Sequence, residues 1–193
     1  MRHLFIISIL LFLNSCGEPS KREILEIKND NLKDQVLETY KEGLQALDEG
    51  DVLYASKKFN EVELLFPLSE WASKSSLMSA YAFWSDGYYS NSINELKRFM
   101  KLYPNDDNLD YAHYLMAMNY YDSIIDEKKD LKPLIEAKKY FTIITNDFKD
   151  TDYALDAKYK LDLIEDLLAA KEMYIARHYI KKKKRISENN RLK

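Results

Sequence analysis

The sequence repeats itself along its middle, and this repetition constrains the fold more than any other feature. Gly50 precedes Pro67 by the same number of residues as Gly87 precedes Pro104, and an aromatic residue stands directly before each proline. Glycine accommodates the positive φ that closes a helical hairpin, and proline cannot continue a helix. Each segment from glycine to proline is therefore predicted to be the second helix of a helical hairpin.

Aligning the chain on this frame reveals a third copy and columns of equivalent residues. Each copy has four equivalent positions: a small residue, a large apolar residue, a second apolar residue and an aromatic residue. Steps of four, three and four residues separate these positions and keep all of them on one helix face. The columns are Ala55, Ser92 and Ala137; Phe59, Leu96 and Phe141; Val62, Phe99 and Ile144; and Phe66, Tyr103 and Phe148. In the third copy Lys149 replaces the proline, so that the stop signal is weaker there.

A second recurrence marks the starts of the first helices. An acid, an aromatic residue and an alanine occupy 70–72, 110–112 and 152–154, and an acid in the first turn complements the positive end of the helix dipole. The pattern predicts first helices at about 33–48, 70–85 and 110–125, second helices at about 51–65, 88–102 and 133–147, and an extended loop at about 126–130. It also predicts one long helix from Asp152 to about Lys182, because neither glycine nor proline follows Asp150.

The composition agrees with an all-α fold. Four glycines and four prolines in 193 residues are too few for the turns of a sheet protein. A hydrophobic content of 46% with 15 Tyr argues against a disordered chain. The formal charge of -3 lacks the basic character of a nucleic-acid binder, so no DNA or RNA partner is expected.

Helix-turn-helix units of about 34 residues with this small, aromatic and proline pattern resemble the tetratricopeptide repeat. The resemblance implies an all-α superhelix, an α-solenoid whose units bury their faces only against their neighbours. Three such repeats are expected over 33–150. Residues 151–193 are expected to hold the long helix and an incomplete fourth repeat, in which Glu188 stands where a small residue belongs.

The first residues of the chain resemble a signal peptide followed by a lipid-attachment site. After a cationic start, Leu4 to Leu13 contain one polar residue, Ser8; at about 1.5 Å per residue this stretch covers about half of a bilayer core and is typical of a signal peptide. Leu13-Asn14-Ser15-Cys16-Gly17 then resembles the bacterial lipobox. We expect a lipoprotein signal peptide at 1–15, lipidation of Cys16, and a lipidated N-terminus with a polar tether over 16–32. The alternative is an ordinary signal peptide with an incidental cysteine.

Nothing in the sequence indicates catalysis. His113 and His178 have no cysteine or acid at metal-ligand spacing, and the four glycines form no phosphate-binding loop. No nucleophile elbow is present either. The chain is therefore expected to be no enzyme, with no cofactor and no metal.

The first helices of tetratricopeptide arrays line a concave groove, and the resemblance implies the same here. The first-helix residues expected to face the groove are Leu37, Tyr40, Leu44, Leu77, Tyr81, Trp84, Tyr114, Ala117 and Tyr121. Tyr and Trp offer a large contact area with a polar tip, which suits a peptide. The candidate peptide-binding residues are Tyr40, Leu44, Tyr81, Trp84, Tyr114 and Tyr121. The alternative is that about half of them pack between repeats.

A cationic run follows near the C-terminal end: Lys181, Lys182, Lys183, Lys184 and Arg185. It could be a solvated helix end, a contact with anionic phospholipid or a contact with a protein partner. We favour the protein partner.

The lipobox, the helical units ending in Phe66-Pro67 and Tyr103-Pro104, the segment 108–112 and the segment 169–179 together resemble the BamD family. BamD proteins are tetratricopeptide lipoproteins of the machine that assembles outer-membrane β-barrels. The resemblance implies an outer-membrane location on the periplasmic face, docking on BamA beside other lipoproteins, and binding of unfolded barrel precursors. It also implies that the region with Asn190 and Arg191 helps to contact BamA. Family members usually continue through the rest of a fourth and a fifth repeat, so the chain resembles a C-terminally shortened member of the family.

Two functional hypotheses from different classes follow. In the first, the chain is a non-enzymatic assembly factor that holds barrel precursors in its N-terminal groove and docks on BamA through Lys181–Arg185 and Arg191. In the second, it is another periplasmic tetratricopeptide lipoprotein, an adaptor in cell-envelope or cell-wall maintenance. Co-purification with a barrel protein would distinguish them.

Overall fold

The computed structural model describes residues 21–67, 69–124 and 131–191, and side chains within 31–183 of these ranges. Its helices are α2 (Lys21–Asp48), α3 (Val52–Leu65), α4 (Glu70–Ser85), α5 (Tyr89–Leu102), α6 (Leu109–Asp122), α7 (Lys132–Asp147) and α8 (Asp152–Arg191), and no strand occurs among the described residues. The all-α prediction is confirmed. Within these ranges, none of the helices combines the length and the apolar character needed to cross a membrane.

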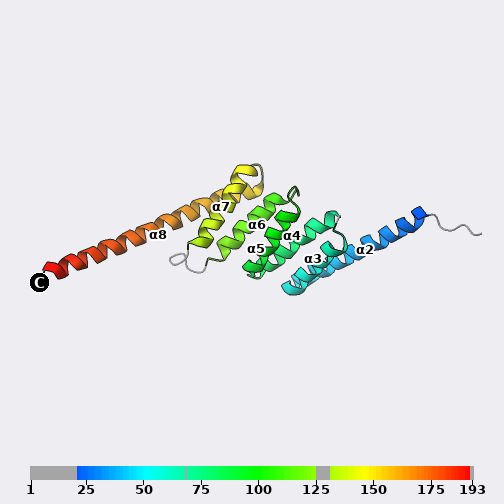
Figure 1. Cartoon of the computed structure of the whole chain (residues 1–193), viewed down its shortest axis with the longest axis horizontal. Coiled ribbons are helices and arrows are strands. Elements are labelled where there is room, and N and C mark those ends of the chain that lie inside the picture. Colours follow the sequence, from blue (N-terminus) through cyan, green and yellow to red (C-terminus); the bar gives the residue numbers. More distant parts are fainter. Residues whose placement is uncertain (1–20, 68, 125–130, 192–193) are drawn as a thin grey trace, which may run out of the picture.

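The helices stack in chain order as three hairpins, and each helix contacts the next (Figure 1). In each hairpin the second helix (α3, α5 or α7) packs against the first helix of its own unit and of the following one. α2 and α8 extend away from opposite ends of the array (Figure 1).

The hairpin turns follow the predicted chemistry. Gly50 and Gly87 have φ of 81° and 77°, the left-handed region that favours glycine. At the far end of each second helix, the predicted aromatic residue is the C-cap, and its backbone N–H donates to a carbonyl one turn earlier. These C-caps are Phe66, Tyr103 and Phe148. α7, the second helix of the third unit, therefore stops at the equivalent position even though no proline follows it.

Three of the four predicted columns form the core, and the aromatic column (Phe66, Tyr103 and Phe148) is half-buried. Ala55, Ser92 and Ala137 are fully buried, as are the members of the Phe59 and Val62 columns. One close contact was not predicted: a Cβ added to Gly43 of α2 would lie 2.8 Å from the ring of Phe59. Glycine is needed there because the Phe59 ring fills the space beside the helix.

Two helices are longer than the pattern predicts. α2 begins at Lys21 rather than at about residue 33, so much of the segment expected to be a polar tether is helical. Residues 21–42 contain neither glycine nor proline, so nothing stops the helix earlier. α8 continues to Arg191, beyond the expected end near Lys182. The lengthened loop at 126–130 lies outside the described residues.

Candidate functional site

The first helices of successive units touch one another along one side of the array: α4 contacts α2 and α6, and α6 contacts α8. We call the surface made by α2, α4, α6 and residues 152–163 of α8 the first-helix face. All the predicted peptide-binding residues belong to helices of this face.

At the α2 end of the face, Tyr40 is a core residue. Only 7% of it is exposed, and its ring lies 5.3 Å from Phe59 and 5.1 Å from Trp71 between centroids. Leu44, one turn further along α2, is 37% exposed. Tyr40 therefore supports the face from beneath, and Leu44 lies at its surface.

In the middle of the face, the half-buried side chains of Tyr81 and Trp84 on α4 lie with ring centroids 5.7 Å apart. The Trp84 Nε1–H donates a 2.9 Å hydrogen bond to Oδ2 of Asp122 at the end of α6. A carboxylate of the next first helix thus holds the indole in place.

The same arrangement recurs one unit later. The Tyr114 hydroxyl on α6 donates a 2.7 Å hydrogen bond to Oδ2 of Asp156 on α8, and its ring lies 5.0 Å from that of Tyr153. Burial raises the pKa of Tyr114, and the Asp156 carboxylate adds to the rise. The phenol therefore stays neutral and continues to donate its hydrogen bond to Asp156.

Tyr121 completes the predicted set. It is half-buried at the end of α6, with the ammonium of Lys160 4.9 Å from its ring centroid and the Phe141 ring beneath it at 6.3 Å. Of the other residues that were expected to face the groove, Leu77 and Ala117 are buried and Leu37 is 39% exposed. The face is therefore a mixture of packing residues and accessible aromatics.

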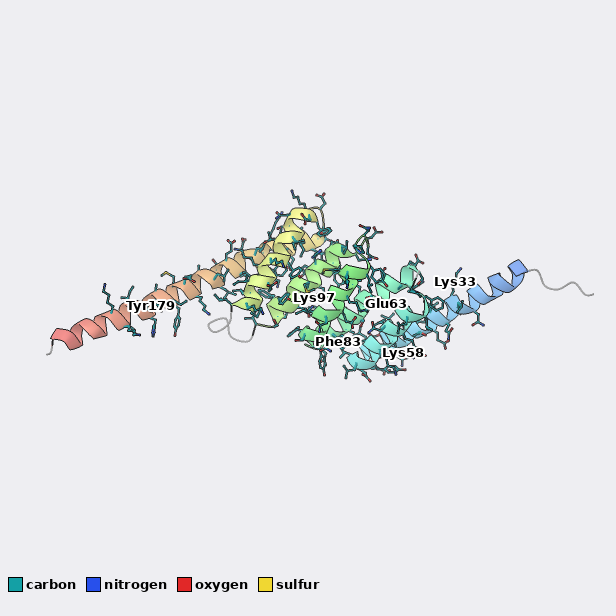
Figure 2. All side chains as sticks on the ribbon, in the orientation of Figure 1. Lys33, Lys58, Glu63, Phe83, Lys97 and Tyr179 are labelled. Carbon is teal, nitrogen blue, oxygen red and sulfur yellow. The ribbon has the colours of Figure 1, made fainter. Side chains whose placement is uncertain are left out.

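The cationic run is only partly described. Lys181, Lys182 and Lys183 are exposed on α8. Lys184, Arg185 and Arg191 lie beyond the described side chains, and Cys16 lies outside the described residues altogether. The structure brings none of the described lysines of this run near the first-helix face, because α8 carries them away from the array (Figure 2).

A polar cluster that sequence reasoning missed lies on the opposite side, between α3 and α5. Glu63, 7% exposed, accepts hydrogen bonds from Arg98 at 2.8 Å and from the Tyr103 hydroxyl at 2.9 Å. Burial and then Glu63 raise the pKa of Tyr103 to about 12. The one signal in the sequence was Tyr103 in a column otherwise held by phenylalanine, since a half-buried hydroxyl needs a partner.

A cavity of about 600 Å³ opens beside this cluster, with Leu64, Pro67 and Leu102 among its lining residues. Leu64 is 81% exposed. The surface of the second helices thus has an apolar depression of its own, separate from the predicted peptide-binding residues.

No group of three or more metal-ligating side chains occurs within the described ranges. His113 lies between the rings of Tyr140 and Phe148, and its Nδ1 is buried without a hydrogen-bond partner.

The half-buried aromatic side chains of the first-helix face are suited to contact with another chain. The stacked helical hairpins that carry them define a protein of the tetratricopeptide solenoid class.

A family model described as "YfiO: Outer membrane lipoprotein" matches residues 33–193. The chain belongs to this YfiO/BamD family of outer membrane lipoproteins. Relatives named outer membrane protein assembly factor BamD include those of Caulobacter vibrioides (36% identity, 80% of this chain and 50% of the relative), Rickettsia prowazekii (34%, 79% and 61%) and Neisseria gonorrhoeae (30%, 80% and 61%). The chain therefore spans half to about three fifths of the length of these relatives.

Proposed function

We propose that this chain is a non-enzymatic outer-membrane lipoprotein of the β-barrel assembly machine. It docks on a BamA-like barrel component beside other lipoproteins of the machine and receives unfolded outer-membrane protein precursors for folding and insertion. Its relatives carry the name of outer membrane protein assembly factors. Membership of the same family supports the same role here.

The observation that carries this proposal is the aromatic first-helix face. Tyr81, Trp84, Tyr114 and Tyr121 are half-buried there rather than sealed in the core. Carboxylates on neighbouring helices fix Trp84 and Tyr114, so these side chains have little rotamer freedom left to lose when a peptide binds. A fixed aromatic surface of this kind suits an extended client segment that ends in an aromatic residue.

The remaining parts of the proposal concern attachment. Cys16 carries the lipid that holds the chain at the periplasmic face of the outer membrane, because several acyl chains make a stable anchor. The run Lys181–Arg185, together with Arg191, contacts the BamA-like partner. Its exposed lysines project from the array and are accessible to another protein.

The client site is tested by titrating a labelled peptide copied from the aromatic end of a barrel protein. Trp84→Ala and Tyr121→Ala should each weaken binding about thirtyfold, the cost of truncating an aromatic anchor. Tyr54→Ala on α3 removes a 43% exposed tyrosine away from this face and is the matched control. Circular dichroism confirms that each variant stays helical. Unchanged binding by both face variants, with loss in a Lys183→Ala variant, would place the client on α8 instead.

Attachment and partner are tested in the full chain. Cys16→Ala should leave the protein unprocessed or mislocalised, and outer-membrane fractionation of this variant without a partner would contradict the lipid anchor. Purification in mild detergent should co-purify a barrel protein with periplasmic domains. Its absence would favour the alternative, a tetratricopeptide lipoprotein that acts as an adaptor in cell-envelope maintenance.

A further inference from the structure

The cavity between α3 and α5 is lined partly by apolar and partly by polar side chains. Leu64, Pro67 and Leu102 form the apolar part, and Leu64 and Leu102 are 81% and 54% exposed. Glu63 and Arg98 belong to the polar part, and Figure 2 shows Glu63 within the array. The volume of about 600 Å³ falls within the range of about 300–1,000 Å³ that is usual for ligand sites. The cavity is therefore large enough to receive a side chain of another molecule.

The polar part is organised around the guanidinium of Arg98. Its Nη1 donates to Oε1 of Glu63 at 2.8 Å and lies 2.7 Å from Oε2. Its Nε and Nη2 donate to Oε2 of Glu95 at 3.0 and 2.8 Å. Nη2 also donates to Asn60 and Ser76, both at 3.1 Å. All three nitrogens of the guanidinium therefore have acceptors within the protein.

The face of this guanidinium remains available to a ligand. The N–H groups of arginine lie in the plane of the guanidinium, so the acceptors occupy its edge. The side chain is nevertheless 37% exposed and lines the cavity. A guanidinium face attracts the face of an aromatic ring by cation–π interaction and by stacking. Because Glu63 and Glu95 already hold Arg98 in one orientation, little rotamer freedom is left to lose when a ring stacks on it.

The same contacts argue against an anionic ligand. Two carboxylates, those of Glu63 and Glu95, pair with one guanidinium, so this group of charges is negative overall. Among the described residues that line the cavity, Arg98 is the only cation. A carboxylate or phosphate would have to compete with Glu63 and Glu95 for its nitrogens, whereas a neutral ring needs none of them. The exposed leucines favour an apolar ligand as well.

We propose that the cavity between α3 and α5 binds an aromatic side chain of another protein. The ring stacks on the face of Arg98 and packs against Leu64 and Leu102, and the partner is a segment that presents one exposed Trp, Tyr or Phe. The site is built from second helices, so it is separate from the first-helix face and can be occupied at the same time. It is a binding site beyond the proposed function, which concerns the first-helix face, Cys16 and the end of α8.

Partial exposure sets the size of the expected effect. A cation–π contact at a site open to solvent contributes modestly, so a Trp should bind about fivefold more tightly than an aliphatic residue. The contact joins a neutral ring to a cation that is already paired. Added salt should therefore change this preference little, since salt chiefly screens interactions between charges.

The first test titrates the isotopically labelled full chain with three capped pentapeptides, in which alanines surround a central Trp, Leu or Glu. The methyl resonances of Leu64 and Leu102 and the Nε–H resonance of Arg98 report this cavity and not the first-helix face. The Trp peptide should bind about fivefold more tightly than the Leu peptide, and the Glu peptide should bind most weakly. The Trp peptide alone should shift the Nε–H resonance upfield, because protons above a ring are shielded.

Two variants separate the cation from the apolar wall. Arg98→Lys keeps a positive charge for Glu63 but lacks the planar face, so the preference for Trp over Leu should fall below about twofold. Leu64→Ser should weaken both peptides about threefold and leave their ratio unchanged. Leu53→Ser, at a 58% exposed leucine of α3 outside the cavity, is the matched control and should change neither. Because Leu64 is so exposed, its variant stays folded even if Arg98→Lys loosens the contacts of Glu63.

The outcomes distinguish this site from the proposed client site. Trp84→Ala should leave the shifts at Leu64 and Leu102 unchanged, and their loss in this variant would overturn the proposal. Equal binding of the Trp and Leu peptides by the parent would overturn it too, as would tighter binding of the Glu peptide, which would indicate an anion site. A fivefold preference that survives in folded Arg98→Lys would assign the ring to another group. None of these results bears on whether the first-helix face binds clients.

Discussion

The two halves of α8 belong to one helix but have different surroundings. In the first half Ala154, Ala157 and Ile164 are buried against α7 and α6. Between 169 and 183 no described residue is buried, and Met173, Tyr174, Tyr179 and Ile180 are 55–65% exposed. Figure 2 shows Tyr179 on the part of the helix that projects from the array.

This difference separates what makes a helix from what makes it stable. Both halves lack helix breakers, so both have the local sequence of a helix. Only the first half is held by packing, and most of the stability of a protein helix comes from an apolar face buried on neighbours. The predictions below test this contrast, from the largest expected effect to the smallest.

Hydrogen exchange should show the largest contrast. Backbone amides of α8 beyond residue 168 should exchange at least about a thousandfold faster than those of α5, whose Leu96 and Phe99 are fully buried. Opening the projecting part disturbs no core contact, whereas opening α5 exposes the core of its unit. Equal protection of the two segments would show that another molecule covers the end of α8.

Removal of a large side chain should affect only the array. Phe59→Ala should lower the free energy of unfolding by about 3–5 kcal/mol, because Phe59 is fully buried between α2 and α3. Tyr179→Ala, which removes an aromatic residue from the projecting part, should stay within about 0.5 kcal/mol. Urea unfolding followed by circular dichroism measures both, and similar losses would mean that the two regions are equally packed.

Addition of volume should give the same contrast at a smaller scale. Ala55→Leu or Ala137→Leu should cost about 1–3 kcal/mol, since both alanines are fully buried where two helices meet. Ala176→Leu is the matched change at an exposed position of α8 and should have almost no effect. Equal melting temperatures for the buried and exposed variants would contradict the conclusion that Ala55 and Ala137 lie where two helices pack.

Protonation of His113, a half-buried histidine, should give the smallest effect. Burial lowers the pKa of His113 below its ordinary value of 6.5, although the charge of Asp147 acts in the opposite direction. Below about pH 6.5 the unfolded chain therefore binds a proton more readily than the folded chain. The free energy of unfolding should fall with decreasing pH by at most about 1.4 kcal/mol per unit from this group.

The measurement is the difference in pH dependence between the parent and His113→Gln, which cannot take up the proton. The slope below pH 6.5 should be shallower in the variant. His178→Gln, which removes the exposed histidine of the projecting part, is the control. If both variants change the slope equally, burial of His113 is not its cause.

The sequence by itself determined the repeat. Gly50 and Gly87 mark turns because their φ is left-handed, and the small and apolar columns are buried because their spacing keeps them on one helix face. These are local properties of the chain. The choice of Trp84, Tyr114 and Tyr121 as groove residues came instead from the resemblance to tetratricopeptide arrays, whose first helices line a groove.

Only the tertiary structure decided which of these residues are accessible and what holds them. Tyr40 and Trp84 were both predicted to bind a peptide, yet Tyr40 is buried against Phe59 and Trp71, while Trp84 stays half-buried on Asp122. Their partners lie on other helices, so no local pattern specifies them. Burial depends on the helix that packs opposite, which is why the array and the projecting part of α8 could not be distinguished until the helices were placed in space.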